Sequence, residues 1–205
     1  MKNKYYLLLI IWILVFIWSA INPKDYFTWM LEVTPGVIGM IIILLTYKKF
    51  QFSYFIYVLI LLHCIVLFVG GKYTYAENPF FEYIKNMFDL GRNNYDKLGH
   101  FMQGFVPSLI LREIIIKLKI INQKKWIPYF MISTAMFISA IYELIEWMVS
   151  EITGESADAF LGTQGYVWDT QSDMLYALIG SLVAIVVFSR IHDRVMVGKE
   201  LRNFT

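Results

Sequence analysis

Long apolar runs separated by short polar segments dominate the chain. Six of these runs have close to the roughly 20 residues that a helix needs to cross a bilayer. They cover residues 5–21, 35–47, 52–69, 98–116, 126–148 and 172–189. The second run is short, and we expect its helix to begin earlier, near residues 27–31. The pattern predicts an all-α polytopic membrane protein, a six-transmembrane-helix bundle that forms a single domain over residues 1–205.

The segment between the third and fourth runs predicts a short amphipathic helix on the membrane surface. Asn78-Pro79 can start this helix, because proline is favoured at the first helical position, and Gly91 supplies a stop signal. Its apolar residues recur at helical spacing: Phe80, Phe81, Ile84, Met87 and Phe88. Two interpretations stay open, a lid over a functional site and an interfacial anchor.

Composition supports the membrane assignment. Hydrophobic residues make up 58% of the chain and charged residues 17%, whereas soluble domains have about 45–50% and about 25%. The single cysteine, Cys64, excludes an internal disulfide. No basic patch of the kind that binds nucleic acid is present. The lipid bilayer is therefore the expected partner, with no nucleic acid.

Lysine and arginine are distributed unevenly between the two sets of span ends. Twelve of them lie near one set and five near the other. Because cytoplasmic loops carry the excess of basic residues, the richer side is expected to face the cytoplasm. Both termini then lie in the cytoplasm, which requires an even number of spans and agrees with six.

Acidic residues gather in the last third of the chain. Residues 126–189 contain no lysine or arginine but seven acids. Three pairs of polar residues share a helix face at the outer end of a span: Asp96 with His100, Glu143 with Glu146, and Asp169 with Asp173. Ionised groups at membrane depth are costly unless they are paired, which makes them candidates for function. The fourth, fifth and sixth spans are thus predicted to form one polar site at the extracytoplasmic face.

The residue types of this site favour a divalent metal. Carboxylates that share a site take up protons or recruit a cation, and oxygens with one imidazole suit Mg, Mn or Zn. We expect His100, Glu143 and Asp173 to hold the metal. Glu146 or Asp169 would be the catalytic acid–base group, while the metal polarises a phosphoryl or acyl oxygen. Partly protonated carboxylates that relay protons are the alternative.

Further residues are expected to line the site. They are Asp96, Lys97, Gln103, Asp158, Gln164 and Trp168. Simpler roles stay open for several of these positions: Asp96 and Asp169 can be helix N-caps, His100 can be a structural histidine, and Trp168 can belong to an interfacial aromatic belt.

The motifs around these residues resemble the YjdF-type family of bacterial inner-membrane proteins. They are Asp96-Lys97-x-x-His100, Tyr142-Glu143-x-x-Glu146-Trp147, Leu161-Gly162-Thr163-Gln164-Gly165 and Trp168-Asp169-Thr170-Gln171-x-Asp173. The resemblance covers most of residues 95–184. It implies a multi-pass protein of the bacterial cytoplasmic (inner) membrane and these candidate positions, but no reaction.

A more distant resemblance is to VanZ-like membrane proteins. Asp96, Lys97 and His100 match the first element of that family, and Asp173 and Gly180 match its last. Ala177 stands where that family has asparagine, which weakens the transfer of a shared site. This resemblance implies a role with envelope lipids or cell-wall precursors.

Three functional hypotheses follow from the site. The first is a membrane-embedded site that acts on a lipid-linked or envelope-precursor ligand. The second is a proton- or ion-coupled small-solute transporter, which predicts polar groups across the membrane. The third is a structural or accessory membrane protein without catalysis. The sequence leaves open whether the protein is an enzyme.

Overall fold

The described part of the chain folds into helices joined by turns and short loops. The computed structural model describes residues 3–153 and 163–202. The helices are α1 (Asn3–Ala20), α2 (Tyr26–Thr46), α3 (Tyr54–Tyr73), α4 (Pro79–Met87), α5 (Tyr95–Lys117), α6 (Ile127–Thr153), α8 (Asp169–Val183) and α9 (Ser189–Arg202). Short 3₁₀ turns η1 (Tyr75–Glu77) and η2 (Lys124–Trp126) precede α4 and α6, and a π-helical stretch η4 (Ala184–Phe188) joins α8 to α9.

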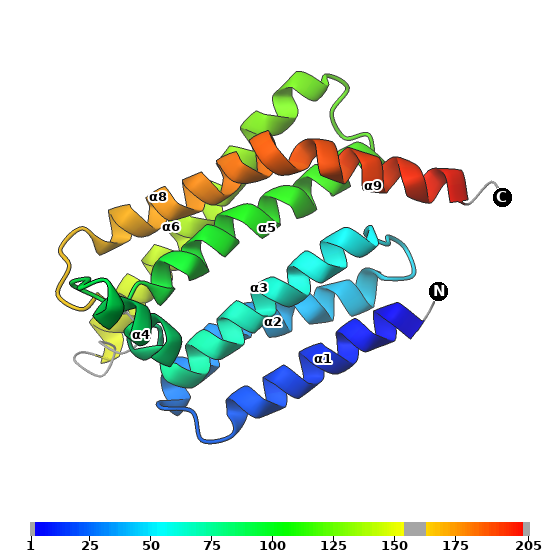
Figure 1. The fold of residues 1–205 in the computed structure, drawn as a ribbon. Coiled ribbons are helices and arrows are strands. Elements are labelled where there is room, and N and C mark those ends of the chain that lie inside the picture. Colours follow the sequence, from blue (N-terminus) through cyan, green and yellow to red (C-terminus); the bar gives the residue numbers. More distant parts are fainter. Residues whose placement is uncertain (1–2, 154–162, 203–205) are drawn as a thin grey trace.

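The long helices form two groups that meet between α3 and α5. One group contains α1, α2 and α3, and the other contains α5, α6 and α8 (Figure 1). The beginning of α1 and the end of α9 lie at one end of the bundle, whereas α4 and the turn before α8 lie at the other end (Figure 1). The two ends of the described chain are therefore at the same end of the bundle.

Five helical segments are long and apolar enough to cross a membrane, among the residues that the structure describes. They are Asn3–Ala20, Tyr26–Thr46, Tyr54–Tyr73, Lys124–Thr153 and Asp169–Met196. Their outward faces carry large exposed apolar side chains such as Leu45 and Phe137, which suits contact with lipid. The expectation of an all-α polytopic membrane protein is thus confirmed. The remaining expected span, residues 98–116, falls within α5.

The second and fourth helices start where the sequence indicates, with defined caps. Helix α2 begins at Tyr26, and the Asp25 side chain accepts the Thr28 N–H. Helix α4 begins at Pro79, where the Asn78 side chain accepts two backbone N–H groups. It ends at Met87, earlier than the glycine stop signal indicated, because Asp89 (φ 50°) takes the left-handed conformation.

Helix α4 has the character of a surface helix. None of its residues is buried, and Phe80 and Tyr83 are about two-thirds exposed, at 66% and 65%. Phe81 packs edge-to-face on Tyr95 at the start of α5, with 5.2 Å between ring centroids. This arrangement matches the predicted amphipathic helix between the third and fourth spans.

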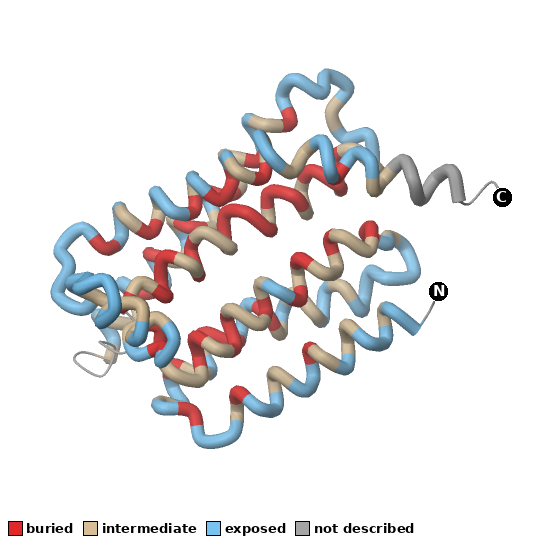
Figure 2. Tube along the Cα trace, in the orientation of Figure 1, coloured by how far each residue is buried: buried red, intermediate tan, exposed pale blue. Residues whose placement is uncertain are grey.

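Helix α5 is the central element of the bundle. It packs against α3, α6 and α8, and Figure 2 shows that it is buried along most of its length. Its polar residues point inward. Helix α5 is less apolar than the other long helices because these polar side chains have partners inside the protein, not because they face water. These partners form two polar clusters, one near each end of α5.

Helices α5 and α8 cross at backbone contact. A Cβ atom on Gly104 would lie 1.8 Å from the Ala177 carbonyl oxygen, and one on Gly180 would lie 2.1 Å from the Phe101 carbonyl oxygen. Beside the crossing, the Ser108 hydroxyl donates a hydrogen bond to Ser181 Oγ (2.9 Å). Small residues allow such close approach between membrane helices. The crossing holds the first turns of α5 and α8 side by side.

A charged cluster fixes the other end of α5. Glu113 is fully buried and accepts hydrogen bonds from the Ser53 backbone N–H and hydroxyl, from Lys117 and from His192 Nε2 (2.8 Å). Arg112 pairs with Asp193 at 2.7 Å. These contacts tie α5 to the N-terminus of α3 and to α9. The cluster is satisfied by its own members, which is the expected state of buried charges.

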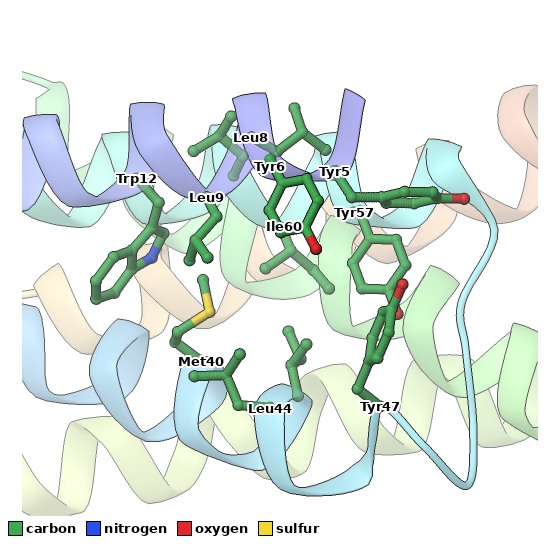
Figure 3. Close-up of a pocket in the computed structure, with 12 residues that line it drawn as sticks. Tyr5, Tyr6, Leu8, Leu9, Trp12, Met40, Leu44, Tyr47, Tyr57 and Ile60 are labelled. Atoms are coloured by element: carbon green, nitrogen blue, oxygen red, sulfur yellow. The ribbon is translucent and has the colours of Figure 1, made fainter. Parts of the chain in front are cut away.

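A cavity lies within the N-terminal group of helices. It has a volume of about 340 Å³ and lies between α1, α2 and α3. Figure 3 shows Trp12, Leu9 and Met40 on its apolar side and Tyr5, Tyr47 and Tyr57 at its other end. The described residues of its lining are apolar or aromatic, and none of them is charged.

We predict that Gly104→Ala destabilises the protein strongly. The added methyl group meets the backbone of α8, which cannot move aside as a flexible side chain can. Overpacking of this kind costs at least about 1–3 kcal/mol. Thermal unfolding of the purified protein in detergent measures the effect. Gly39→Ala in α2 is the matched control, because a Cβ atom there meets nothing within 4 Å. Equal melting temperatures for the two variants would contradict the backbone crossing.

Candidate functional site

Polar residues from five parts of the chain converge at the end of the bundle where α4 lies. Helix α5 contributes Asp96, Lys97, His100 and Gln103; α6 contributes Tyr142, Glu143 and Glu146; and α8 contributes Asp169 and Asp173. Glu32 from α2 and Arg92 from the segment before α5 complete the group. The expected meeting of His100, Glu143, Glu146, Asp169 and Asp173 is seen in the structure, where all five are at least 92% buried.

One side of the site is an ion-pair network made of Arg92, Asp96, Lys97, Asp169 and Asp173. Lys97 Nζ lies 2.6 Å from Asp173 Oδ1, 2.8 Å from Asp169 Oδ1 and 3.4 Å from Asp96 Oδ2. Arg92 pairs with Asp169 and with Asp96. Buried charges are stable only when partners neutralise them, and this network meets that condition.

Arg92 is a member that sequence reasoning missed. Of the lysines and arginines at this end of the chain's spans, only Lys97 was expected to line the site. The structure adds Arg92, whose side chain is 13% exposed. Its guanidinium carbon also lies 5.6 Å from the centre of the Tyr166 ring, a cation–π contact. The sequence alone does not indicate that Arg92 belongs to the site, because the loop that carries it reaches the site only by folding back.

His100 occupies the centre of the site. Its Nδ1 atom lies 3.0 Å from Gln103 Oε1, and since that oxygen can only accept, Nδ1 carries the hydrogen. Its Nε2 atom faces Asp96 Oδ1 (3.4 Å), Glu143 Oε1 (3.8 Å) and Asp173 Oδ1 (3.9 Å). A bare lone pair facing three carboxylate oxygens would be repelled. Nε2 therefore carries a second proton, accepts a hydrogen bond from a protonated carboxyl group, or binds a cation.

Three residues have ligand atoms close enough together for one metal ion. Atoms of Asp96, His100 and Asp173 lie within 4.8 Å of one another, and all three residues are buried. Glu143 lies beside this group, and its Oε1 atom finds no hydrogen-bond donor among the described residues. The expected ligand set of His100, Glu143 and Asp173 is therefore next to the observed group, which has Asp96 in place of Glu143.

The other side of the site opens into a groove. This cavity has a volume of about 370 Å³ and is bounded by α2, α3, α5 and α6. Its polar end is lined by Glu32, Tyr75, Asp96, His100, Gln103, Tyr142 and Glu146. The remainder is largely apolar and continues along α5 through Val106, Pro107 and Ile110 to Ile114. From Asp96 to Ile114 the wall is about 27 Å long at helical rise.

Glu32 is the second residue that sequence reasoning missed. It is 97% buried, and Tyr142 donates its hydroxyl hydrogen to Glu32 Oε2 at 3.1 Å. Glu32 lies inside the apolar run of α2. Like Glu143, it is therefore an acidic residue at membrane depth, which makes it a candidate for function. Residue 32 falls within the expected second helix, but the sequence did not indicate that its side chain would face Tyr142 of α6.

Tyr75 forms part of the mouth of the groove. Its ring fits between Gly70 and Gly99, where added Cβ atoms would lie 2.3 and 2.6 Å from ring atoms. Burial raises the pKa of the Tyr75 hydroxyl well above its usual range, with Glu32 adding to the effect. The side chain is therefore a neutral hydrogen-bonding group.

The remaining site residues expected from the sequence are Asp169, Trp168, Gln164 and Asp158. Asp169 is the first residue of α8 and belongs to the ion-pair network, while the N-cap positions of α5 and α8 are held by Asn94 and Trp168. Trp168 is 62% exposed, as an interfacial residue would be. Gln164 exchanges two hydrogen bonds with the Asn93 backbone, at 2.8 and 2.9 Å, and so holds the segment that carries Arg92. Asp158 lies outside the described residues.

We predict that Lys97→Met destabilises the protein by about 3–5 kcal/mol, because removing one partner of a buried ion pair leaves the other charges uncompensated. Denaturant or thermal unfolding in detergent measures the loss. The second substitution Asp173→Asn in the same chain should recover part of it, since it removes one of the stranded charges. Lys85→Met, which breaks a half-exposed pair with Glu82, is the control and should have little effect. A Lys97 variant as stable as this control would contradict the network.

Comparisons with known proteins place the chain in a family. Residues 4–194 match the family model described as predicted membrane protein (DUF2238). The chain is 44% identical over 191 residues to the inner membrane protein YjdF of Escherichia coli (strain K12), which covers 93% of this chain and 89% of that protein. No solved structure matches significantly. The resemblance seen in the motifs is thereby confirmed, and the chain belongs to the DUF2238 family of predicted membrane proteins.

Proposed function

We propose that this protein binds the polar head of a lipid-linked or other amphiphilic envelope molecule at an intramembrane site. The groove is the observation that carries this proposal. Carboxylates, an imidazole and tyrosine hydroxyls line one end, and apolar side chains line the remainder. Sites for small molecules are mostly apolar with a few placed polar groups. An amphiphile has the same division of chemistry along its length.

The dimensions of the groove support a ligand that lies along the bilayer normal. Its α5 wall of about 27 Å compares with a hydrocarbon core of about 30 Å. The ligand's apolar chain would lie beside Ile110 and Ile114, and its head beside His100 and Glu146. The groove thus suits a molecule already dissolved in the membrane.

We propose further that Asp96, His100 and Asp173 hold a divalent cation, with Glu143 completing the site. Asp96 presents Oδ2 to Arg92 and Lys97, and Oδ1 to His100, so one of its oxygens faces away from the basic residues. His100 is oriented by Gln103 with Nε2 toward the acids, as second-shell partners orient metal-binding histidines. Mg, Mn and Zn remain the candidate ions for this donor set.

Of the two candidate acid–base groups, Glu146 is favoured. Glu146 lines the groove, whereas Asp169 is engaged by Arg92 and Lys97. An acid–base group must reach its substrate through a hydrogen bond or one water molecule. Glu146 is the better placed for this, and Asp169 is better placed to position Lys97.

We also propose that α5 crosses the membrane, which brings the number of transmembrane helices to six. Both termini then face the cytoplasm. Helix α5 has 23 residues, enough to cross the bilayer, and it lies at the centre of the bundle. The excess of lysine and arginine is at the end where α1 starts and α9 ends. The name of the Escherichia coli relative supports placement in the inner membrane. The candidate site then faces the extracytoplasmic side.

An ion-coupled transporter is the second candidate function, and one observation favours it. Polar side chains follow the buried face of α5 from His100 through Gln103 and Ser108 to Arg112, near the second charged cluster. This continuity is what a relay across the membrane requires. Ion flux into liposomes that is abolished by Glu143→Gln would rank this function first.

The metal is tested by elemental analysis of protein purified without chelators. We expect a stoichiometric divalent ion in the wild type and its loss in His100→Gln and Asp173→Asn. Glu151→Gln, an exposed acid on α6, should keep the ion. Wild-type protein that is folded but binds no Mg, Mn or Zn after dialysis against each would refute the metal site.

The groove is tested by filling it. Gly39 lines the groove, and a Cβ atom added there meets nothing within 4 Å, so we expect Gly39→Trp to fold and to place its ring in the cavity. We expect this variant to lose lipids that remain bound to the wild type in native mass spectrometry. The neighbouring Ile38→Trp, at a 51% exposed position, should retain them. Identical lipid retention in both variants would exclude a binding role for the groove.

A further inference from the structure

The polar end of the groove is rich in acids, and His100 is its one basic side chain among the described residues. Glu32, Asp96 and Glu146 line it, and no lysine or arginine is among the groove-lining residues in the described part of the chain. Lys97 and Arg92 face the opposite side of the site, where the aspartates of α8 engage them. The two sides of the site therefore differ in charge. A ligand head that enters the groove meets carboxylates, an imidazole and tyrosines.

Glu146 is a buried carboxylate without a partner. It is 92% buried and lines the groove, yet no described residue donates a hydrogen bond to it or forms an ion pair with it. Glu143, three residues earlier on the same helix, is a second buried acid beside it. A buried carboxylate in this position is costly unless a donor or a cation reaches it. This observation is independent of the acidic lining itself.

The charge balance of the whole site leaves room for a cation in the groove. Six carboxylates are buried there: Glu32, Asp96, Glu143, Glu146, Asp169 and Asp173. Only Lys97 and Arg92 are permanently positive. With a divalent ion held by Asp96, His100 and Asp173, the acids left without a basic partner among the described residues are those on the groove side, Glu32 and Glu146. An anionic head group would have to lie against these two acids.

We propose that the groove recognises amphiphiles whose head carries a primary ammonium group, with Glu146 and Glu32 as its acceptors. This inference rests on the proposed function and names its ligand class. A primary ammonium offers three N–H donors. These can form hydrogen bonds with the carboxylate of Glu146 and with the oxygen lone pairs of Glu32 that remain available. The Tyr142 and Tyr75 rings beside them suit a cation. The apolar chain of the ligand then follows α5 along the groove.

The structure also argues for a primary rather than a quaternary ammonium. A trimethylammonium head carries charge but has no N–H group, so it would leave Glu146 without a donor. The same reasoning disfavours a neutral hydroxyl head, which supplies a single donor and no charge. Aminated phospholipids and simple alkylamines share the required chemistry. The experiment separates these two sources.

The test is a competition for the groove of wild-type protein reconstituted in detergent. Dodecylamine, dodecyltrimethylammonium, dodecanol and dodecyl sulfate differ only in their head, and each competes with bound lipid in native mass spectrometry. We expect dodecylamine to bind at least about tenfold more tightly than the others, which is about 1.4 kcal/mol. Phosphatidylethanolamine, compared with phosphatidylglycerol of the same chains, identifies a lipid as the source. Preference for the anionic members of both series would overturn the proposal.

Two variants link the preference to the named residues. Glu146→Gln and Glu32→Gln keep the side-chain shape and should each reduce the preference for dodecylamine about tenfold. Glu151→Gln on the same helix as Glu146 should leave it unchanged. If a glutamine variant does not fold, the head-group series on the wild type alone decides.

The outcomes also separate this proposal from the function on which it rests. If all four amphiphiles bind equally and Gly39→Trp blocks them, the groove binds amphiphiles but does not select ammonium, and only this inference fails. If none of them binds and lipid retention is the same in Gly39→Trp, both proposals fail.

Discussion

The close crossing of α5 and α8 determines where the charged groups of this protein meet. Gly104 and Gly180 bring the two backbones into contact, and helical geometry does the rest. His100 lies one turn before Gly104, and Asp173 lies one turn before Ala177, the residue that faces Gly104. The turns that carry His100 and Asp173 are therefore neighbours, because the two helices are in contact one turn further along. The distances between Lys97, Asp169 and Asp173 follow from that single contact.

The site separates two uses of charge. On the α8 side, aspartates are matched with Lys97 and Arg92, and buried ion pairs of this kind fix a geometry more than they add stability. On the α2 and α6 side, Glu32 and Glu146 face a groove without a basic partner. The first arrangement positions His100, and the second leaves acceptors for an incoming molecule. A purely structural cluster would be expected to neutralise both sides.

The sequence predicts the fold well because hydrophobic length and charge bias are local properties. Five of the six expected runs became apolar membrane-length helices, and the surface helix begins at its predicted proline. The candidate site was predicted in part, because i, i+3 and i, i+4 spacing places Glu143 with Glu146 and Asp169 with Asp173 on single faces. Arg92 and Glu32 were missed because their roles depend on tertiary contacts. Arg92 lies on a loop that folds back onto the site, and Glu32 meets Tyr142 of α6 only when α2 and α6 are brought together. The identity of the third close ligand atom, from Asp96 rather than Glu143, depends on helix rotation, which spacing alone does not fix.

The second charged cluster constrains how the proposed ligand would enter the groove. Glu113, His192 and Ser53 hold one end of α5, and the ion-pair network holds the other. A helix anchored at both ends cannot slide or tilt to admit a ligand. Helix α2 forms the opposite wall, packs mainly on α3, and contains Pro35, which removes a backbone hydrogen bond in mid-helix. Lateral entry from the surrounding lipid, by bending of α2, is the route that the architecture leaves open.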